Sequence, residues 1–186
     1  FIRNRFYITL TVSISDIHDT VLGIPQAYQE ALEAMEYRMV MGTGKIIKYE
    51  AIRNPNYIYR YPMDLEYKLI NSIKTGDFEK AREITDSIFS DNMSGGVLSI
   101  DMAKCLMFNL VSTMIKTMNE FSETSDKDLW QNIDPISRML KCNTIMDMKE
   151  CMEDILKDVC KYIEGKKQSH NVELKDAIID FINMQV

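Results

Sequence analysis

The hydrophobic pattern of this chain changes near Tyr61-Pro62, and this change limits the folds that the chain can adopt. Before this point, apolar and polar residues alternate over residues 6–14, which is typical of a strand with one apolar face. After it, apolar residues recur at the steps of three and four that are typical of amphipathic helices. The sequence therefore predicts an α+β, predominantly helical fold. A short strand-helix-strand unit, a partial α/β sandwich, is followed by an α-helical bundle.

The strand-helix-strand unit has two predicted strands, at residues 6–14 and 45–49. A helix is predicted between them over residues 24–41, where Pro25 suits the first turn. We expect the apolar stripe of this helix to pack on the sheet and its polar side to face solvent. The stripe comprises Tyr28, Ala31, Leu32, Met35 and Met39, and the polar side comprises Gln29, Glu30, Glu33 and Glu36.

The helical part begins with two helices that we expect to pack as antiparallel neighbours. Thr75-Gly76 ends the first helix, and Asp77 is suited to cap the second. A third helix, over residues 98–121, is apolar around most of its circumference. It should therefore lie at the centre of the bundle, in contact with several other helices.

Three more helices are predicted after the central one. The first covers residues 129–140, with an apolar stripe of Ile133, Ile136 and Leu140. The second covers residues 145–165, and a basic, polar hinge at residues 165–169 should separate it from the third, which Asn171 could cap. The stripe of the second comprises Met148, Met152, Ile155, Val159 and Ile163, and that of the third comprises Leu174, Ile178, Phe181 and Ile182.

Composition and charge argue against several classes of protein. The formal net charge is −6, and basic residues are interspersed with acidic ones, which argues against direct binding to nucleic acid. No segment approaches the ~20 apolar residues of a membrane span, and the chain does not start like a signal peptide. The four cysteines lack the two-residue spacing of zinc or redox pairs. We therefore expect these cysteines to behave as small apolar residues in a reducing compartment. The sequence therefore predicts a cytoplasmic segment with no direct membrane contact.

No residue pattern in the sequence indicates catalysis. His18 and His170 are far apart, and neither has the carboxylate or cysteine spacing of a metal site or a catalytic dyad. We therefore expect no catalytic, metal-binding or cofactor-binding residues. The chain has fourteen Met residues, and those on helix stripes are expected to fill the core, although flexible thioethers also suit ligand pockets. These stripe positions are Met102, Met107, Met114, Met118, Met139, Met148 and Met152.

One set of side chains is a candidate ligand cleft. Tyr57, Tyr59, Tyr61 and Tyr67 cluster where the two parts of the chain meet. They could line a cleft or form an amphipathic seam between the parts. His18 follows a predicted strand and precedes a helix, a place where side chains can point into a cleft. The candidate cleft residues are therefore His18, Tyr57, Tyr59 and Tyr61.

Residues 6–49 resemble a known family segment. The run Ile8-Thr-Leu-Thr-Val-Ser-Ile-Ser15 precedes Ala27-Tyr28 and Ala31-Leu32, and Gly44-Lys-Ile-Ile-Lys-Tyr49 follows. These residues resemble the cytoplasmic regulatory region of AraC/XylS-family transcriptional regulators of the YesN type, in which a degenerate GGDEF-like domain ends in this way. Residues 61–90 are similar to the helical segment that follows in that family. Residues 171–183 are similar to the first helix of an AraC-type DNA-binding domain.

The resemblance implies three parts. Residues 1–60 would be the C-terminal part of a degenerate GGDEF-like α/β domain, and residues 61–168 a helical regulatory bundle. Residues 169–186 would be a linker helix and the start of a DNA-binding domain. The chain opens within an alternating stretch and closes within an amphipathic helix, so we expect both ends to lie inside a longer protein. Gly95-Gly96 is followed by Val97-Leu98, so the chain lacks the Gly-Gly-Asp/Glu-Glu-Phe motif of an active diguanylate cyclase.

The function that this resemblance implies is noncatalytic. The chain would transmit a signal, with dimerisation as a candidate role, and DNA would be bound only by a helix-turn-helix domain outside it. A homodimer partner and a small-molecule effector are further candidates, and no cofactor is expected. Two alternatives remain: an interaction scaffold of a response regulator, and a nucleotide-binding cyclase relic.

Overall fold

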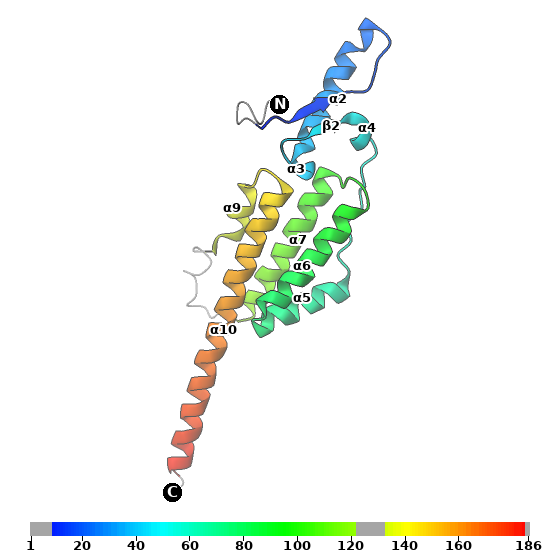
Figure 1. The fold of residues 1–186 in the computed structure, drawn as a ribbon. Coiled ribbons are helices and arrows are strands. Elements are labelled where there is room, and N and C mark those ends of the chain that lie inside the picture. The colour runs from blue at the N-terminus through cyan, green and yellow to red at the C-terminus, as the bar shows by residue number, and fades with distance from the viewer. Residues whose placement is uncertain (1–8, 122–132, 185–186) are drawn as a thin grey trace.

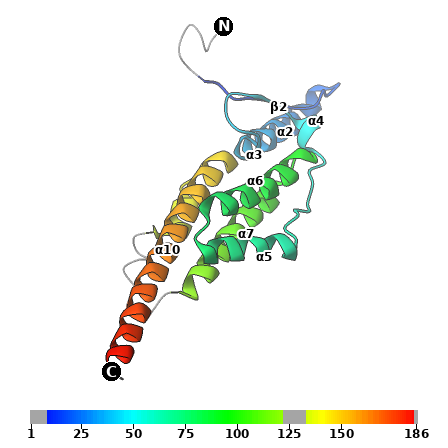
Figure 2. The ribbon, with the colours of Figure 1, turned by 60° about the horizontal axis from the view of Figure 1, so that its bottom comes forward.

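A short parallel sheet and a set of helices occupy separate parts of the molecule (Figure 1). This computed structural model describes residues 9–121 and 133–184. The α/β unit, residues 9–52, lies at one end of the helical unit, residues 63–184, in both Figure 1 and Figure 2. The α+β, predominantly helical fold class is confirmed.

The sheet of the α/β unit has two short strands, with one face covered. Strands β1 (Val12–Ile14) and β2 (Ile46–Lys48) pair in parallel, with Ser13 opposite Ile47. Ile47 is fully buried in a small core with Ala34, Tyr37 and Ile52. Those three residues come from helix α2 (Ile24–Glu36), the residue after it, and helix α4 (Tyr49–Ile52). A 3₁₀ turn, η1 (Val21–Gly23), leads into α2, and residues 6–8 of the predicted first strand lie outside the described residues.

The side of α2 that packs is not the predicted one. The prediction placed the Tyr28 and Leu32 stripe on the sheet, but these side chains are 61% and 44% exposed. Glu30, predicted on the solvated side, is only 7% exposed, and Ala34 is fully buried. The error arises because the two-stranded sheet covers a narrow strip of the helix. The three hydrogen bonds that the Glu30 carboxylate accepts or shares also offset the cost of burying it.

The paired helices that start the helical unit form as predicted. Helix α5 (Met63–Thr75) ends at Gly76, whose φ of 78° lies in the left-handed region that glycine adopts without strain. Asp77 then caps α6 (Phe78–Ser94), since its side chain accepts a hydrogen bond of 3.1 Å from the backbone N–H of Lys80. The two helices pack against each other. Helix α6 ends at Ser94.

The core of the helical unit is centred on two long helices. Helix α7 (Ile100–Asn119) packs on α5, and α10 (Ile145–Met184) packs on α5, α6 and α7. The predicted centrality of α7 is confirmed, and α10 shares that position. The stripe predicted for residues 145–165 is confirmed as buried. The side chains of the stripe predicted at Leu174, Ile178, Phe181 and Ile182 lie outside the described part of the structure. The buried core includes Leu69, Ile73, Ile88, Leu106, Leu110, Met114, Met118, Met152, Ile155 and Ile163.

Helix α9 (Pro135–Leu140) is shorter than the predicted helix at residues 129–140, whose residues 129–132 lie outside the described part. Its predicted stripe is wrong in part. Ile133 is buried, but Ile136 and Leu140 are 43% and 69% exposed, and Met139 is buried instead. The short helix packs on α7 and α10 through the side that carries Met139.

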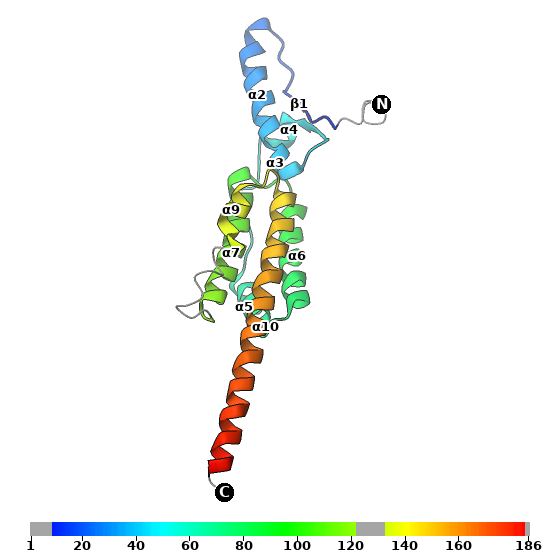
Figure 3. The same cartoon turned by 90° about the vertical axis from the view of Figure 1, so that its left-hand side faces the viewer.

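Helix α10 passes through the predicted hinge without a break. The hinge at residues 165–169 is therefore wrong as an interruption, and Asn171 does not begin a separate helix. The physical reason is that this segment contains no proline, and one glycine costs a helix only about 1 kcal/mol relative to alanine. The C-terminal half of α10 extends well past the other helices (Figures 1 and 3).

The continuity of α10 predicts the effect of Gly165→Ala. This substitution should raise the free energy of unfolding by about 0.5–1 kcal/mol, because glycine in a helix interior loses more conformational freedom than alanine. A Cβ atom at this position would meet no heavy atom within 4 Å. Denaturant unfolding followed by circular dichroism measures the change.

Gly76→Ala is the matched control. Gly76 has a positive φ, and a Cβ there would lie 3.3 Å from Cβ of Glu164, so the same substitution should lower stability. A Gly165→Ala chain that is less stable than the wild type would contradict a continuous α10.

Candidate functional site at the junction of the two units

The α/β unit and the helical unit meet at a joint that we call the junction. Helix α3 (Arg38–Met41) follows α2 directly and packs on α7 and α10. Met39 and Val40 pack against the core of the helical unit. In the opposite direction, Val97 and Ile100 pack against the small core of the α/β unit. Each unit therefore contributes side chains to the core of the other.

The segment that links the two units is fastened to the helices along its length. The backbone N–H of Asn56 donates to the carbonyl of Val97 (2.7 Å), and the N–H of Ser99 donates to the carbonyl of Asn56 (2.9 Å). The side chain of Asn92 accepts from the N–H of Arg60 (2.6 Å) and donates to its carbonyl (2.8 Å). Each such hydrogen bond contributes about 0.5–1.5 kcal/mol net. The linker is thus part of the junction and not a loose tether.

Two of the predicted cleft residues, Tyr59 and Tyr61, lie in this linker against α7. The hydroxyl of Tyr59 accepts a hydrogen bond of 2.6 Å from the side-chain amide of Asn109. The hydroxyl of Tyr61 donates to Oγ1 of Thr113 (3.1 Å), and the Glu66 carboxylate lies 3.2 Å from the same Oγ1. Burial raises the pKa of Tyr61 to about 12, although the hydrogen bond to Thr113 acts the other way. Tyr61 is therefore a neutral donor at physiological pH.

The other two predicted cleft residues do not pack with this pair, although Tyr57 lies in the same linker. Tyr57 is 69% exposed. His18 lies in the α/β unit, where its Nε2 is 2.9 Å from Oε2 of Glu30. The hydrogen bond with His18 is the largest cause of the lowered pKa of Glu30. Gly23 packs closely over the ring, since a Cβ there would lie 2.6 Å from Cβ of His18. The structure therefore places Tyr59 and Tyr61 side by side against α7 but does not bring His18 to them.

Two hollows flank α3 at the junction. The first, which we call the junction pocket, has a volume of about 370 Å³ and is mostly apolar. The second, the α2 groove, has a volume of about 550 Å³ and lies between α2, the start of α7 and the residues before α10. The junction pocket is lined by Val40, Met41, Lys45, Phe89, Met93, Gly96, Val97, Leu98, Ile145 and Met146. The α2 groove is lined by Leu32, Met35, Glu36, Arg38, Met39, Ile100, Lys104 and Asn143.

The sequence patterns did not predict either hollow. The stripe residues Leu32, Met35 and Met39 line the α2 groove instead of packing on the sheet. The apolar stripe of this helix therefore indicated the α2 groove, a surface that faces away from the sheet. The junction pocket combines three segments far apart in sequence, and periodicity within one helix cannot reveal such a combination.

A third hollow lies at the carboxyl ends of the two parallel strands, where ligands often bind in α/β proteins. It has a volume of about 500 Å³ and is lined by Ile14, Ser15, Asp16, Ile17, Lys48, Glu50 and Arg53. Its charges largely offset one another, and Arg53 lies 3.6 Å from the Asp16 carboxylate. Among the residues that the structure describes, no cluster of His, Cys, Asp and Glu could hold a metal ion.

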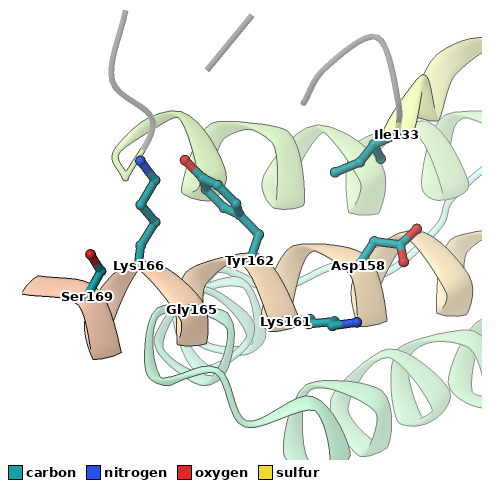
Figure 4. A pocket seen from close by; sticks show the side chains of 7 residues that line it. All are labelled: Ile133, Asp158, Lys161, Tyr162, Gly165, Lys166 and Ser169. Carbon is teal, nitrogen blue, oxygen red and sulfur yellow. The ribbon is translucent and has the colours of Figure 1, made fainter. Parts of the chain in front are cut away.

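A further hollow lies along α10, on the side that faces Ile133 (Figure 4). It is open, about 710 Å³ in volume, and most of its lining residues come from α10 alone. Lys166 lies 5.7 Å from the centre of the Tyr162 ring, and Asp158 lies 3.3 Å from Arg138. Because Lys166 and Asp158 already have partners, this surface has fewer charged groups available to a ligand than the junction has. The remaining lining residues are Ile133, Lys161, Gly165 and Ser169.

Most of the predicted core methionines, and the thiol of Cys160, are buried in the core of the helical unit. Of the predicted core methionines, Met102 is partly buried and the other six are buried, as expected. Cys160 is 1% exposed, and burial raises the pKa of its thiol to about 11. Burial, together with the neighbouring Cys151, also raises the pKa of Cys142 to about 11. Thiols with raised pKa values are poor nucleophiles at neutral pH.

Comparison with known proteins gives a distant relative. The chain is 26% identical over 131 residues to a protein from Bacillus subtilis (strain 168) named "Uncharacterized HTH-type transcriptional regulator YtdP". The aligned region covers 68% of this chain but only 17% of the relative's length. No protein-family model matches the chain, and no solved structure matches it significantly. In the described part of the chain, no helix is long and apolar enough to cross a membrane.

The relative supports a regulatory role of the kind found in transcription regulators. It carries no information on the GGDEF-like origin of residues 1–60, which stays a prediction. The ligand cleft at His18, Tyr57, Tyr59 and Tyr61 also stays a prediction, because only Tyr59 and Tyr61 have been shown to share a surface.

The Tyr61 hydroxyl predicts the effect of Tyr61→Phe. At pH 7 this substitution should lower the free energy of unfolding by about 0.5–1.5 kcal/mol, because it removes the hydrogen bond to Thr113. The raised pKa means that folding favours the neutral phenol, so this contribution is present below about pH 10 and decreases as pH rises toward 12. The stability difference between wild type and variant should therefore shrink over that range.

Denaturant unfolding at a series of pH values measures the difference. Tyr57→Phe is the control, because Tyr57 is exposed and its hydroxyl should contribute little at any pH. Equal effects of the two substitutions would contradict the assigned role of Tyr61.

Proposed function

We propose that this chain is a noncatalytic, signal-transmitting segment of an AraC-family transcription regulator. A helix-turn-helix domain outside the chain would bind DNA, and the chain would act in the cytoplasm as a homodimer that responds to an effector. The observation that carries the proposal is helix α10, which begins at the junction and runs unbroken to Met184.

The geometry supports transmission along α10 as one body. Ile145 and Met146, at its start, line the junction pocket, and its middle is fixed in the core by side chains such as Met152 and Ile155. Its C-terminal half extends past the other helices (Figure 3). A shift of the α/β unit against α10 would therefore move the far end of the helix, because packed helices move as rigid bodies.

Charge and similarity support the same proposal. The net charge of −6 disfavours DNA binding by this chain, so a regulator containing it needs DNA-binding residues elsewhere. The similarity to an HTH-type transcriptional regulator supplies the class.

Gly165→Pro in the full-length protein tests the transmission. Proline in a helix interior costs about 3 kcal/mol and kinks or breaks the helix, so it should uncouple the end of α10 from the junction. We expect a transcription reporter to lose its response to the regulator's signal, while binding of the purified full-length protein to its operator in vitro is retained.

Gly165→Ala is the matched control, because it keeps the helix intact and should keep the reporter response. A normal response from Gly165→Pro would contradict the proposal that α10 transmits the signal. Loss of protein from the cell would be recognised by immunoblot, and the variant would then be replaced by insertion of two glycines after Gly165, for which the same expectation holds.

A further inference from the structure

The junction pocket has a buried apolar floor and an adaptable rim. Phe89, Leu98 and Ile145 are 8%, 1% and 1% exposed and form its most buried part. Met146, at the start of α10, is 48% exposed and lies at the rim. The volume of about 370 Å³ is within the range of small-molecule sites, which is roughly 300–1,000 Å³. Thioether side chains can adjust to a bound apolar body.

One positive charge at this pocket is available to a ligand. Lys45 is exposed, and its ammonium makes no ion pair among the residues that the structure describes. Its backbone is fixed, because its carbonyl accepts a hydrogen bond of 3.0 Å from the N–H of Val12. Lys149 lies over the Phe89 ring at 5.4 Å, but Asp86 and Glu153 hold it at 2.6 Å and 3.2 Å. Lys45 therefore supplies the uncompensated charge.

We propose that the junction pocket binds a small amphipathic carboxylate. The apolar body occupies the floor at Phe89, Leu98 and Ile145, and the carboxylate lies beside the Lys45 ammonium. Since the lining comes from α3, from the connection between α6 and α7, and from the start of α10, the bound molecule holds the α/β unit against the helical unit. The regulatory consequence rests on the proposed function, whereas the binding itself does not.

Octanoate is the probe that tests the charge. Isothermal titration calorimetry of the 186-residue chain should show saturable one-to-one binding of octanoate and weaker binding of octylamine. Lys45→Gln should weaken octanoate binding about three- to five-fold, as expected for a solvent-exposed ion pair, and leave octanol binding unchanged. Lys48→Gln is the matched control, because Lys48 is an exposed lysine at the other end of β2 and should have no effect. Absence of saturable binding, or equal binding of octanoate and octylamine, would overturn the proposal.

Met146→Trp tests the location. The larger side chain at the rim should fill the pocket and lower octanoate affinity at least ten-fold, whereas Met63→Trp, at a position that is 67% exposed elsewhere, should not. Circular dichroism melting verifies that both variants fold. If Met146→Trp changes the oligomeric mass in light scattering and octanoate does not bind, the pocket is a contact between copies of the chain, and the proposal is wrong.

The binding result and the reporter result are separable. Octanoate binding that follows these expectations, with a normal reporter response from Gly165→Pro, would retain the pocket and reject the proposed transmission. A reporter response that depends on α10, without octanoate binding, would reject the pocket alone.

Discussion

The packing of α10 against α5, α6 and α7 is the interaction on which the rest of the structure depends. Met152, Ile155 and Ile163 of this helix are fully buried, and burying each apolar side chain contributes about 1.5–3 kcal/mol. The same helix begins at the junction and ends beyond the bundle. One element therefore provides the core, a wall of the junction pocket and the extension of the molecule.

The junction adds a second constraint. Met39 and Val40 enter the helical core, and Val97 and Ile100 enter the small core of the α/β unit, so neither unit can shift without repacking the other. Close-packed interiors switch between discrete arrangements and do not deform continuously. An effector that stabilised one arrangement would thus change the position of the whole of α10.

Sequence patterns predicted the elements better than their packing. Local chemistry sufficed for the turn at Gly76 and the cap at Asp77, and the apolar circumference of α7 was enough to place it in the core. Glu30 was misplaced, because its burial depends on His18 and on the backbone of Asp16, which approach only in the folded chain. The break expected at Gly165 was wrong, because polar composition alone does not end a helix that packing supports on its N-terminal side. Of the candidate cleft residues, Tyr59 and Tyr61 bond to side chains of α7. Neither lines the junction pocket, which three segments far apart in sequence form.

Hydrogen–deuterium exchange along α10 tests the central claim most directly. The account predicts that amide protection declines gradually from the packed residues near Ile155 toward Met184, with no local minimum at residues 165–169. A window of fast exchange at residues 165–169, with protected amides on both sides, would contradict a continuous helix and restore the hinge.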